Sequence, residues 1–128
     1  MDSSSMYKEH ILELWKEPEN FRPITSATHE RRGFNQSCGD DITVYLLVKD
    51  GKVADASFEG KGCALCFASA SLATEKIKGM NTEDVLKLGS KDLLKLLEIE
   101  VHPARLKCIL LPLESMQKSI REGENKKR

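Results

Sequence analysis

The sequence contains no apolar run near the roughly 18 residues of a membrane-spanning helix, and its start, MDSSSMYKEH, has no hydrophobic segment typical of a secretory signal. It also has no net charge, because 20 basic residues balance 20 acidic ones. Without an overall field the chain is not drawn to nucleic acid or an anionic membrane, so we expect neither as a partner. The length of 128 residues predicts one soluble, cytoplasmic domain with flexible ends at 1–5 and 123–128.

Cysteine is scarce, with four residues in the whole chain, and nothing else suggests export, so a disulfide framework is not expected. In a reducing compartment, grouped thiols are more often metal ligands or nucleophiles. A second Cys-x-x-Cys is missing, which excludes a zinc ribbon. The one such motif, at Cys63–Cys66, follows a hairpin and not a βαβ unit, which argues against a thioredoxin-like fold.

Alternating apolar residues predict a β-hairpin in the middle of the chain. The outgoing strand is residues 42–48, and Asp50 and Gly51 suit the positive φ angles of a type I′ turn. The returning strand, residues 53–58, is expected to place on one face Ala54, Ala56 and Phe58. A weaker, charged alternation over 25–34 predicts an edge strand, in which His29 is a surface or edge histidine and not a ligand.

Helical spacing and capping residues predict an N-terminal helix over 6–16, a helix rich in small residues over 64–78, two short helices, and a last helix beginning at Pro103. The predicted fold is therefore α+β: a three-stranded antiparallel sheet packed on one face by helices, with an N-terminal helix and a long C-terminal helix. The last helix carries an apolar stripe that starts at Leu106. Cys108 lies about 200° around the helix from Leu106, off that stripe. Pro112 predicts a kink beside Cys108.

The residues that carry chemistry come from separate segments. Cys38 precedes the hairpin and Cys63 follows it, so the two hairpin ends bring these thiols together with Asp40. Cys63 opens a helix, where free N–H groups and the helix dipole favour a thiolate. If Cys108 joins them, three thiolates and one carboxylate suit zinc, ferrous iron or an iron–sulfur cluster. A carboxylate in place of a fourth thiolate makes a cluster more exchangeable.

Each neighbouring residue has a plain alternative reading. Asp40 alone could equally be a turn residue after Gly39, and Cys66 could equally be a small apolar core residue. Lys107 could lower a thiol pKa, pair with Asp40, or simply be solvated.

Several stretches together resemble the iron–sulfur cluster assembly scaffold family of the NifU N-terminal, IscU and SufU type: MYKEHILELWKEPEN, NQSCGDDITVYLLV, DGKVADASFEGKGCALCFASASL and HPARLKC. The match covers nearly the whole chain. The resemblance implies that Cys38, Asp40, Cys63 and Cys108 bind the cluster. It further implies that a cysteine desulfurase delivers sulfur as a persulfide, with Cys108 as the first acceptor, and that a transient [2Fe–2S] cluster is built and passed to apo-proteins. Asp40 would keep the cluster labile, and zinc would occupy the site without iron.

The chain departs from both named branches. Lys107 stands where IscU has a histidine, and residues 101–105 replace its Leu-Pro-Pro-Val-Lys segment, so the resemblance does not imply delivery by an Hsp70-type chaperone. The Pro-Ala-Arg and Lys-Cys ending resembles SufU, but Asp41 stands where SufU has arginine. Cys66 is an addition to the three-cysteine pattern and a possible substitute ligand. His102 is a further candidate, favoured as a structural residue at the helix start.

The leading prediction is a scaffold without turnover of its own. The alternative is a zinc-dependent sulfurtransferase that accepts persulfide sulfur, as the SufU resemblance implies. A less favoured reading is a dithiol redox protein that uses Cys63 and Cys66.

Overall fold

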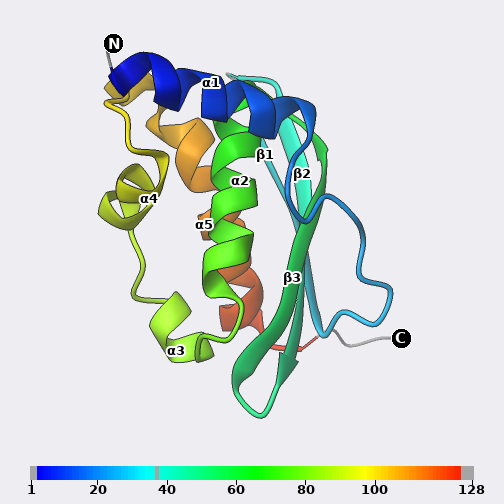
Figure 1. Cartoon of the computed structure of the whole chain (residues 1–128). Helices are drawn as coiled ribbons and strands as arrows, with labels where there is room; N and C mark the ends of the chain where they lie inside the picture. Colours follow the sequence, from blue (N-terminus) through cyan, green and yellow to red (C-terminus); the bar gives the residue numbers. More distant parts are fainter. Residues whose placement is uncertain (1–2, 37, 125–128) are drawn as a thin grey trace.

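Three strands form one antiparallel sheet, and the helices lie on one of its faces (Figure 1). The computed structural model describes residues 3–36 and 38–124. The strand order is β1-β2-β3, with β1 at His29–Asn35, β2 at Asp40–Lys49 and β3 at Lys52–Lys61. The predicted α+β fold and its three-stranded antiparallel sheet are confirmed.

Both the N-terminal helix and the long C-terminal helix are present. The helices are α1 (Ser3–Lys16), α2 (Ala64–Ile77), α3 (Thr82–Val85), α4 (Ser90–Leu97) and α5 (Leu106–Glu122). Part of the predicted flexible leader is helical, since α1 begins at Ser3; residues 1–2 and 125–128 lie outside the described residues. Among the described residues, no helix is long and apolar enough to cross a membrane.

The sheet buries the face that the alternation predicts. The inward side chains of β2, Ile42, Val44 and Leu46, are fully buried. Asp50 and Gly51 have φ angles of 53° and 75°, as a type I′ turn requires. The prediction for Ala54 is wrong: a bulge opposite Leu47 and Val48 makes Ala54 the extra, exposed residue, and Val53 points inward in its place.

His29 lies on the edge strand β1, as predicted, but it is not a surface residue because its side chain is only 6% exposed. It points to the covered face of the sheet, and its Nδ1 lies 2.8 Å from Thr28 Oγ1. Burial lowers the pKa of His29.

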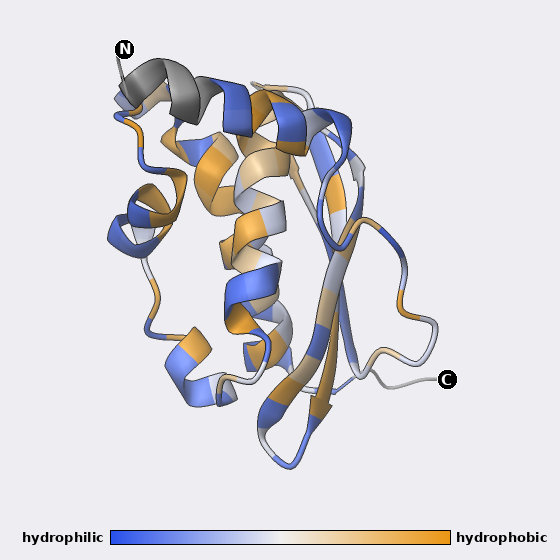
Figure 2. Ribbon diagram, viewed as in Figure 1, coloured by the Kyte–Doolittle hydropathy of each residue, from blue (hydrophilic) through white to orange (hydrophobic). Residues whose placement is uncertain are grey.

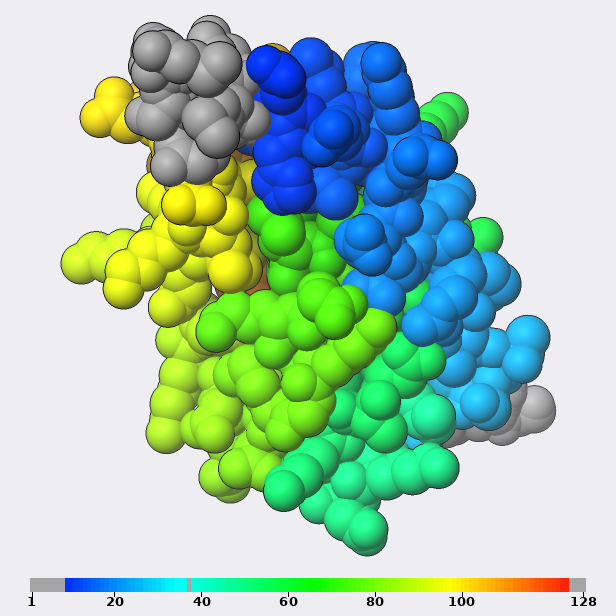
Figure 3. Space-filling model, viewed as in Figure 1, coloured from blue at the N-terminus to red at the C-terminus, as the bar shows by residue number. Residues whose placement is uncertain are grey.

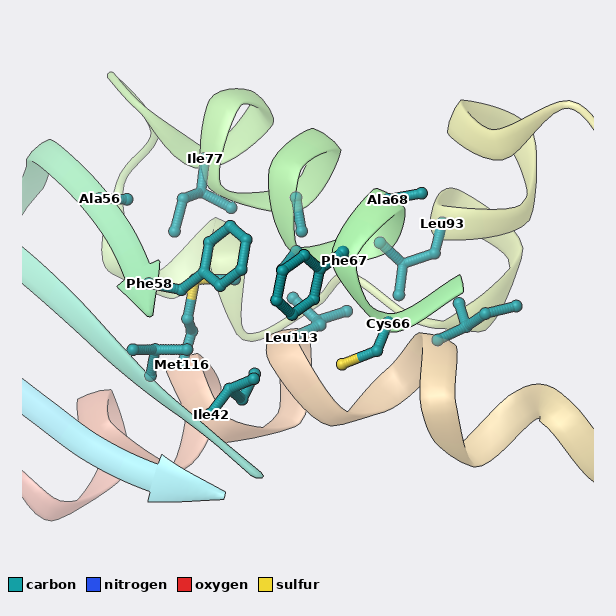
Figure 4. Close-up of a cluster of buried hydrophobic side chains, with 14 of the residues drawn as sticks. Ile42, Ala56, Phe58, Cys66, Phe67, Ala68, Ile77, Leu93, Leu113 and Met116 are labelled. Carbon is teal, nitrogen blue, oxygen red and sulfur yellow. The ribbon is translucent and has the colours of Figure 1, made fainter. Parts of the chain in front are cut away.

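Helices α2 and α5 form the core layer against the sheet, and both carry many hydrophobic residues (Figure 2). Figure 4 shows Phe67 of α2 and Leu113 of α5 in one buried cluster with Ile42 of β2. In Figure 3, the dark blue part of α1 and the segment after it in lighter blue lie against the green atoms of α2. Small residues let α2 approach its neighbours closely: Ser69 Oγ donates to the Ile109 carbonyl at 2.6 Å. Glu19 N donates to Ser71 Oγ at 3.1 Å, which fixes the segment after α1 to α2.

The start of α5 differs from the prediction. Pro103–Arg105 forms a separate 3₁₀ turn, and α5 begins at Leu106. Cys108 does not lie off the buried stripe: it is fully buried, whereas Leu106 is partly exposed. The buried arc of α5 is wide because the sheet and α2 both pack on this helix. Pro112 is buried inside one continuous helix, and the kink stays a prediction.

Candidate metal centre

The four predicted site residues come from three junctions of the fold. Cys38 lies in the turn between β1 and β2, where the Cys38 N–H donates to the Asn35 carbonyl at 3.3 Å. Gly39 has a φ of 72°, a conformation that glycine adopts without strain, and Asp40 then opens β2. Cys63 follows the end of β3 beside that start, because Asp41 pairs with Lys61. Chain segments distant in sequence therefore meet at one end of the sheet.

Three of the four residues come together closely. One ligand atom each from Cys38, Asp40 and Cys108 lies within 4.8 Å of the other two. Asp40 and Cys108 are buried, and Cys38 is half-buried. Helix α5 supplies Cys108 from its first turn, and Asn35 Nδ2 lies 4.0 Å from the Cys108 sulfur. Two soft sulfurs and a carboxylate in such a small space are a donor set for zinc or iron.

The Asp40 carboxylate has one satisfied and one unsatisfied oxygen. Asp40 Oδ1 accepts the Cys63 backbone N–H at 2.9 Å. Asp40 Oδ2 is buried and has no hydrogen-bond partner among the described residues. An unpaired buried carboxylate oxygen is costly unless a cation neutralises it. The residues present therefore fit a bound metal.

Cys63 lies at the edge of this set. It is the N-cap of α2, it is half-buried, and it is not part of the three-residue group. The Cys63 sulfur interacts with the guanidinium of Arg105, and this interaction raises the pKa of Arg105. The sequence reasoning assigned no role to Arg105. Its position one helical turn before Cys108 was the available signal.

The two buried thiols differ from ordinary cysteine. Burial raises the pKa of Cys108, and the neighbouring Cys38 and Cys63 thiols raise it further. Burial also raises the pKa of Cys66, and the nearby charge of Asp40 adds to this effect. Both cysteines belong to the hydrophobic core cluster, and Figure 4 shows Cys66 between α2, which carries it, and α5.

The remaining candidates lie outside the centre. Lys107 is exposed and lines a groove with Phe34 and Asn35, so it does not pair with the buried Asp40 carboxylate. His102 is structural, as favoured, because its Nδ1 accepts the Ala104 N–H at 3.0 Å and caps the 3₁₀ turn. Asp41 pairs with Arg32 at 2.7 and 2.8 Å, and this pairing lowers the pKa of Asp41.

The fold and the site together define a class of protein: an α+β domain with a three-stranded sheet and a candidate cysteine and aspartate metal site at one end of that sheet. The chain belongs to the NifU-like N-terminal domain family, whose model matches residues 6–128. It is 36% identical to the iron–sulfur cluster assembly scaffold protein IscU of Thermotoga maritima, over 91% of this chain and 94% of that protein.

Two further relatives carry SufU names. The chain is 29% identical to the zinc-dependent sulfurtransferase SufU of Bacillus subtilis, over 94% of this chain and 92% of that protein. The crystal structure of a SufU from Fervidobacterium islandicum, described as a candidate scaffold for the SUF system, superposes with a TM-score of 0.78 and 27% identity. The superposition covers 93% of this chain and 99% of the SufU chain. The chain is thus similar to both branches.

Proposed function

We propose that this protein is a scaffold on which a transient [2Fe–2S] cluster is assembled and from which it is passed to apo-proteins. The observation that carries the proposal is the approach of Cys38, Asp40 and Cys108 to within 4.8 Å, with Cys63 held beside Asp40 by its backbone N–H. In this role the cluster is cargo, and the protein is a carrier without turnover of its own. Family membership supports the proposal.

Each residue has a distinct task. The thiolates of Cys38, Cys63 and Cys108 hold the irons, and Asp40 supplies a hard oxygen that releases iron more readily than a fourth thiolate. The Arg105 guanidinium balances part of the negative charge that three thiolates bring to the centre. A cysteine desulfurase is the sulfur donor, and Cys108 accepts the persulfide after moving outward from its buried position.

Anaerobic reconstitution with iron, cysteine and a desulfurase tests the scaffold. The expected product is a visible-absorbing [2Fe–2S] species that transfers to an apo-ferredoxin-type acceptor. Asp40→Ala should prolong the life of this species, because the exchangeable ligand is gone. The matched control is Asp41→Ala, the adjacent carboxylate that pairs with Arg32. A colourless wild-type product, or equal lifetimes for the two variants, would contradict the proposal.

A second candidate function is a zinc-dependent sulfurtransferase, favoured by similarity to the Bacillus subtilis relative of that name. The same donor set suits tetrahedral zinc. Tightly held zinc, together with faster alanine release by the desulfurase and no cluster formation, would select this function over the scaffold.

A further inference from the structure

Two thiols lie in the first turn of α2, and only one of them reaches the surface. Cys63 is the N-cap, with its carbonyl accepting the Phe67 N–H at 3.0 Å, and it is half-buried. Cys66 follows one turn later and is 0% exposed. Residues three apart share one side of a helix, with Cβ atoms about 5–6 Å apart. A disulfide joins Cβ atoms about 3.5–4.5 Å apart, so a small shift of this first turn brings the two sulfurs into bonding distance.

Gly62 places the buried thiol next to the buried carboxylate. A Cβ on Gly62 would lie 3.0 Å from Asp40 Oδ1 and 3.3 Å from the Cys66 sulfur, so both groups border the same glycine. Asp40 is 1% exposed, and its Oδ2 has no hydrogen-bond partner among the described residues. The Cys66 thiol therefore lies beside the proposed metal centre, where sulfide is needed. A reaction at Cys63 leaves the thiols of Cys38 and Cys108 free, because Cys63 lies outside the group that these two form with Asp40. Cys63 itself can bind the cluster only after its disulfide has been reduced.

We propose that Cys66 releases sulfide from a persulfide carried on Cys63. The inference rests on the proposed function, in which sulfur arrives as a persulfide. The Cys66 sulfur attacks the inner sulfur of the Cys63 persulfide. A Cys63–Cys66 bond forms, the bond to the outer sulfur breaks, and the outer sulfur leaves with the electron pair as hydrosulfide.

The protons and electrons of this step balance between Cys63 and Cys66. The Cys66 proton leaves with the outer sulfur, so one hydrogen sulfide is released for each disulfide formed. The persulfide sulfur is reduced to sulfide while Cys66 is oxidised into the disulfide, and a dithiol reductant later restores both thiols. Sulfur thus reaches the centre in the oxidation state that a cluster needs. Cys63 receives it directly or from Cys108, whose thiol interacts with that of Cys63.

The test loads persulfide without a desulfurase. Metal-free protein is treated with inorganic polysulfide under anaerobic conditions, desalted, and followed without reductant for released sulfide and for disulfides mapped by mass spectrometry. Wild type should release one sulfide per Cys63–Cys66 disulfide. Cys66→Ser should keep its Cys63 persulfide and lose the release, with Cys66→Ala as a second variant and thermal unfolding as the check on folding.

The outcomes separate the two proposals. Equal sulfide release by Cys66→Ser, a disulfide that pairs other cysteines, or a stable Cys63 persulfide in the wild type would each overturn the role of Cys66. Because polysulfide bypasses the desulfurase, none of these results bears on the scaffold. Sulfide release by a protein that forms no cluster with iron and a desulfurase would instead contradict the proposed function and support the role of Cys66.

Discussion

The two ends of the sheet differ in whether the buried polar side chains beside them have hydrogen-bond partners. Near the hairpin turn, the buried Gln117 of α5 donates from Nε2 to the carbonyls of Val85 at 3.0 Å and Leu88 at 2.9 Å. At the opposite end, Asp40 is also buried, but its Oδ2 has no hydrogen-bond partner among the described residues. The polar atoms of Gln117 are therefore satisfied within the folded protein. The free oxygen of Asp40 needs a partner that the described residues do not supply, such as a bound cation. Stability and function are therefore separable by position.

The largest effect is expected at the metal-centre end. Cys38→Ala and Cys108→Ala should each abolish the visible absorption of the reconstituted cluster, because each removes one member of the group within 4.8 Å. The fourth cysteine offers the control: Cys66→Ala should keep this absorption when iron and inorganic sulfide are supplied. Absorption spectra at equal protein concentration measure the effect. Loss of this absorption in Cys66→Ala would indicate that Cys66 is a cluster ligand and would contradict the assignment of Asp40 as the fourth ligand.

The next effect is on stability, at the hairpin end. Gln117→Leu should lower the free energy of unfolding by about 1–3 kcal/mol, because the carbonyls of Val85 and Leu88 lose their side-chain donor and the bond to Val85 is fully buried. Cluster yield per folded protein should not change. Urea unfolding measures the difference, and the exposed neighbour Lys118→Met is the control, expected within about 0.5 kcal/mol of wild type. A Gln117→Leu protein with wild-type stability, or with less cluster, would remove the distinction between the two ends.

The smallest effect is a pH dependence at His29. Burial lowers the pKa of His29 from the usual 6.5, while Glu124 opposes this shift. The unfolded chain therefore binds a proton at His29 more readily than the folded chain does. The contribution of the neutral, buried His29 to the free energy of unfolding is complete above pH 6.5 and is lost as the pH falls below it. Compared with wild type, His29→Gln should lose less stability between about pH 7.5 and about pH 5.5. Urea unfolding at both pH values measures this loss, and an equal loss of unfolding free energy in wild type and His29→Gln would contradict the prediction.

The sequence alone predicted most of the fold because the local signals agree with one another. The alternation around Ile42, the Asp50-Gly51 turn and the small residues of α2 each favour one structure. The errors at Ala54 and Cys108 have tertiary causes. A bulge shifts the strand pairing near Ala54, and packing on two sides widens the buried face of α5 beyond a simple helical stripe.

Three of the four residues predicted for the centre lie close together in the structure, and the fourth, Cys63, lies at their edge; their roles as ligands stay a prediction. The hairpin ends place Cys38 and Cys63 together by topology alone. The unpaired Asp40 Oδ2 and the interaction of Arg105 with Cys63 depend on side-chain positions that spacing does not encode. The position of Cys66 beside Gly62 also depends on the path of the turn into α2, which spacing does not encode.

The central claim is that three sulfurs and one carboxylate oxygen converge on a single metal. X-ray absorption at the zinc edge of the zinc-loaded protein tests it most directly. We predict three sulfurs at about 2.3 Å and one oxygen at about 2.0 Å, with the carboxylate oxygen lost in Asp40→Ala. A spectrum with four sulfurs, unchanged in Asp40→Ala and altered in Cys66→Ala, would contradict the account.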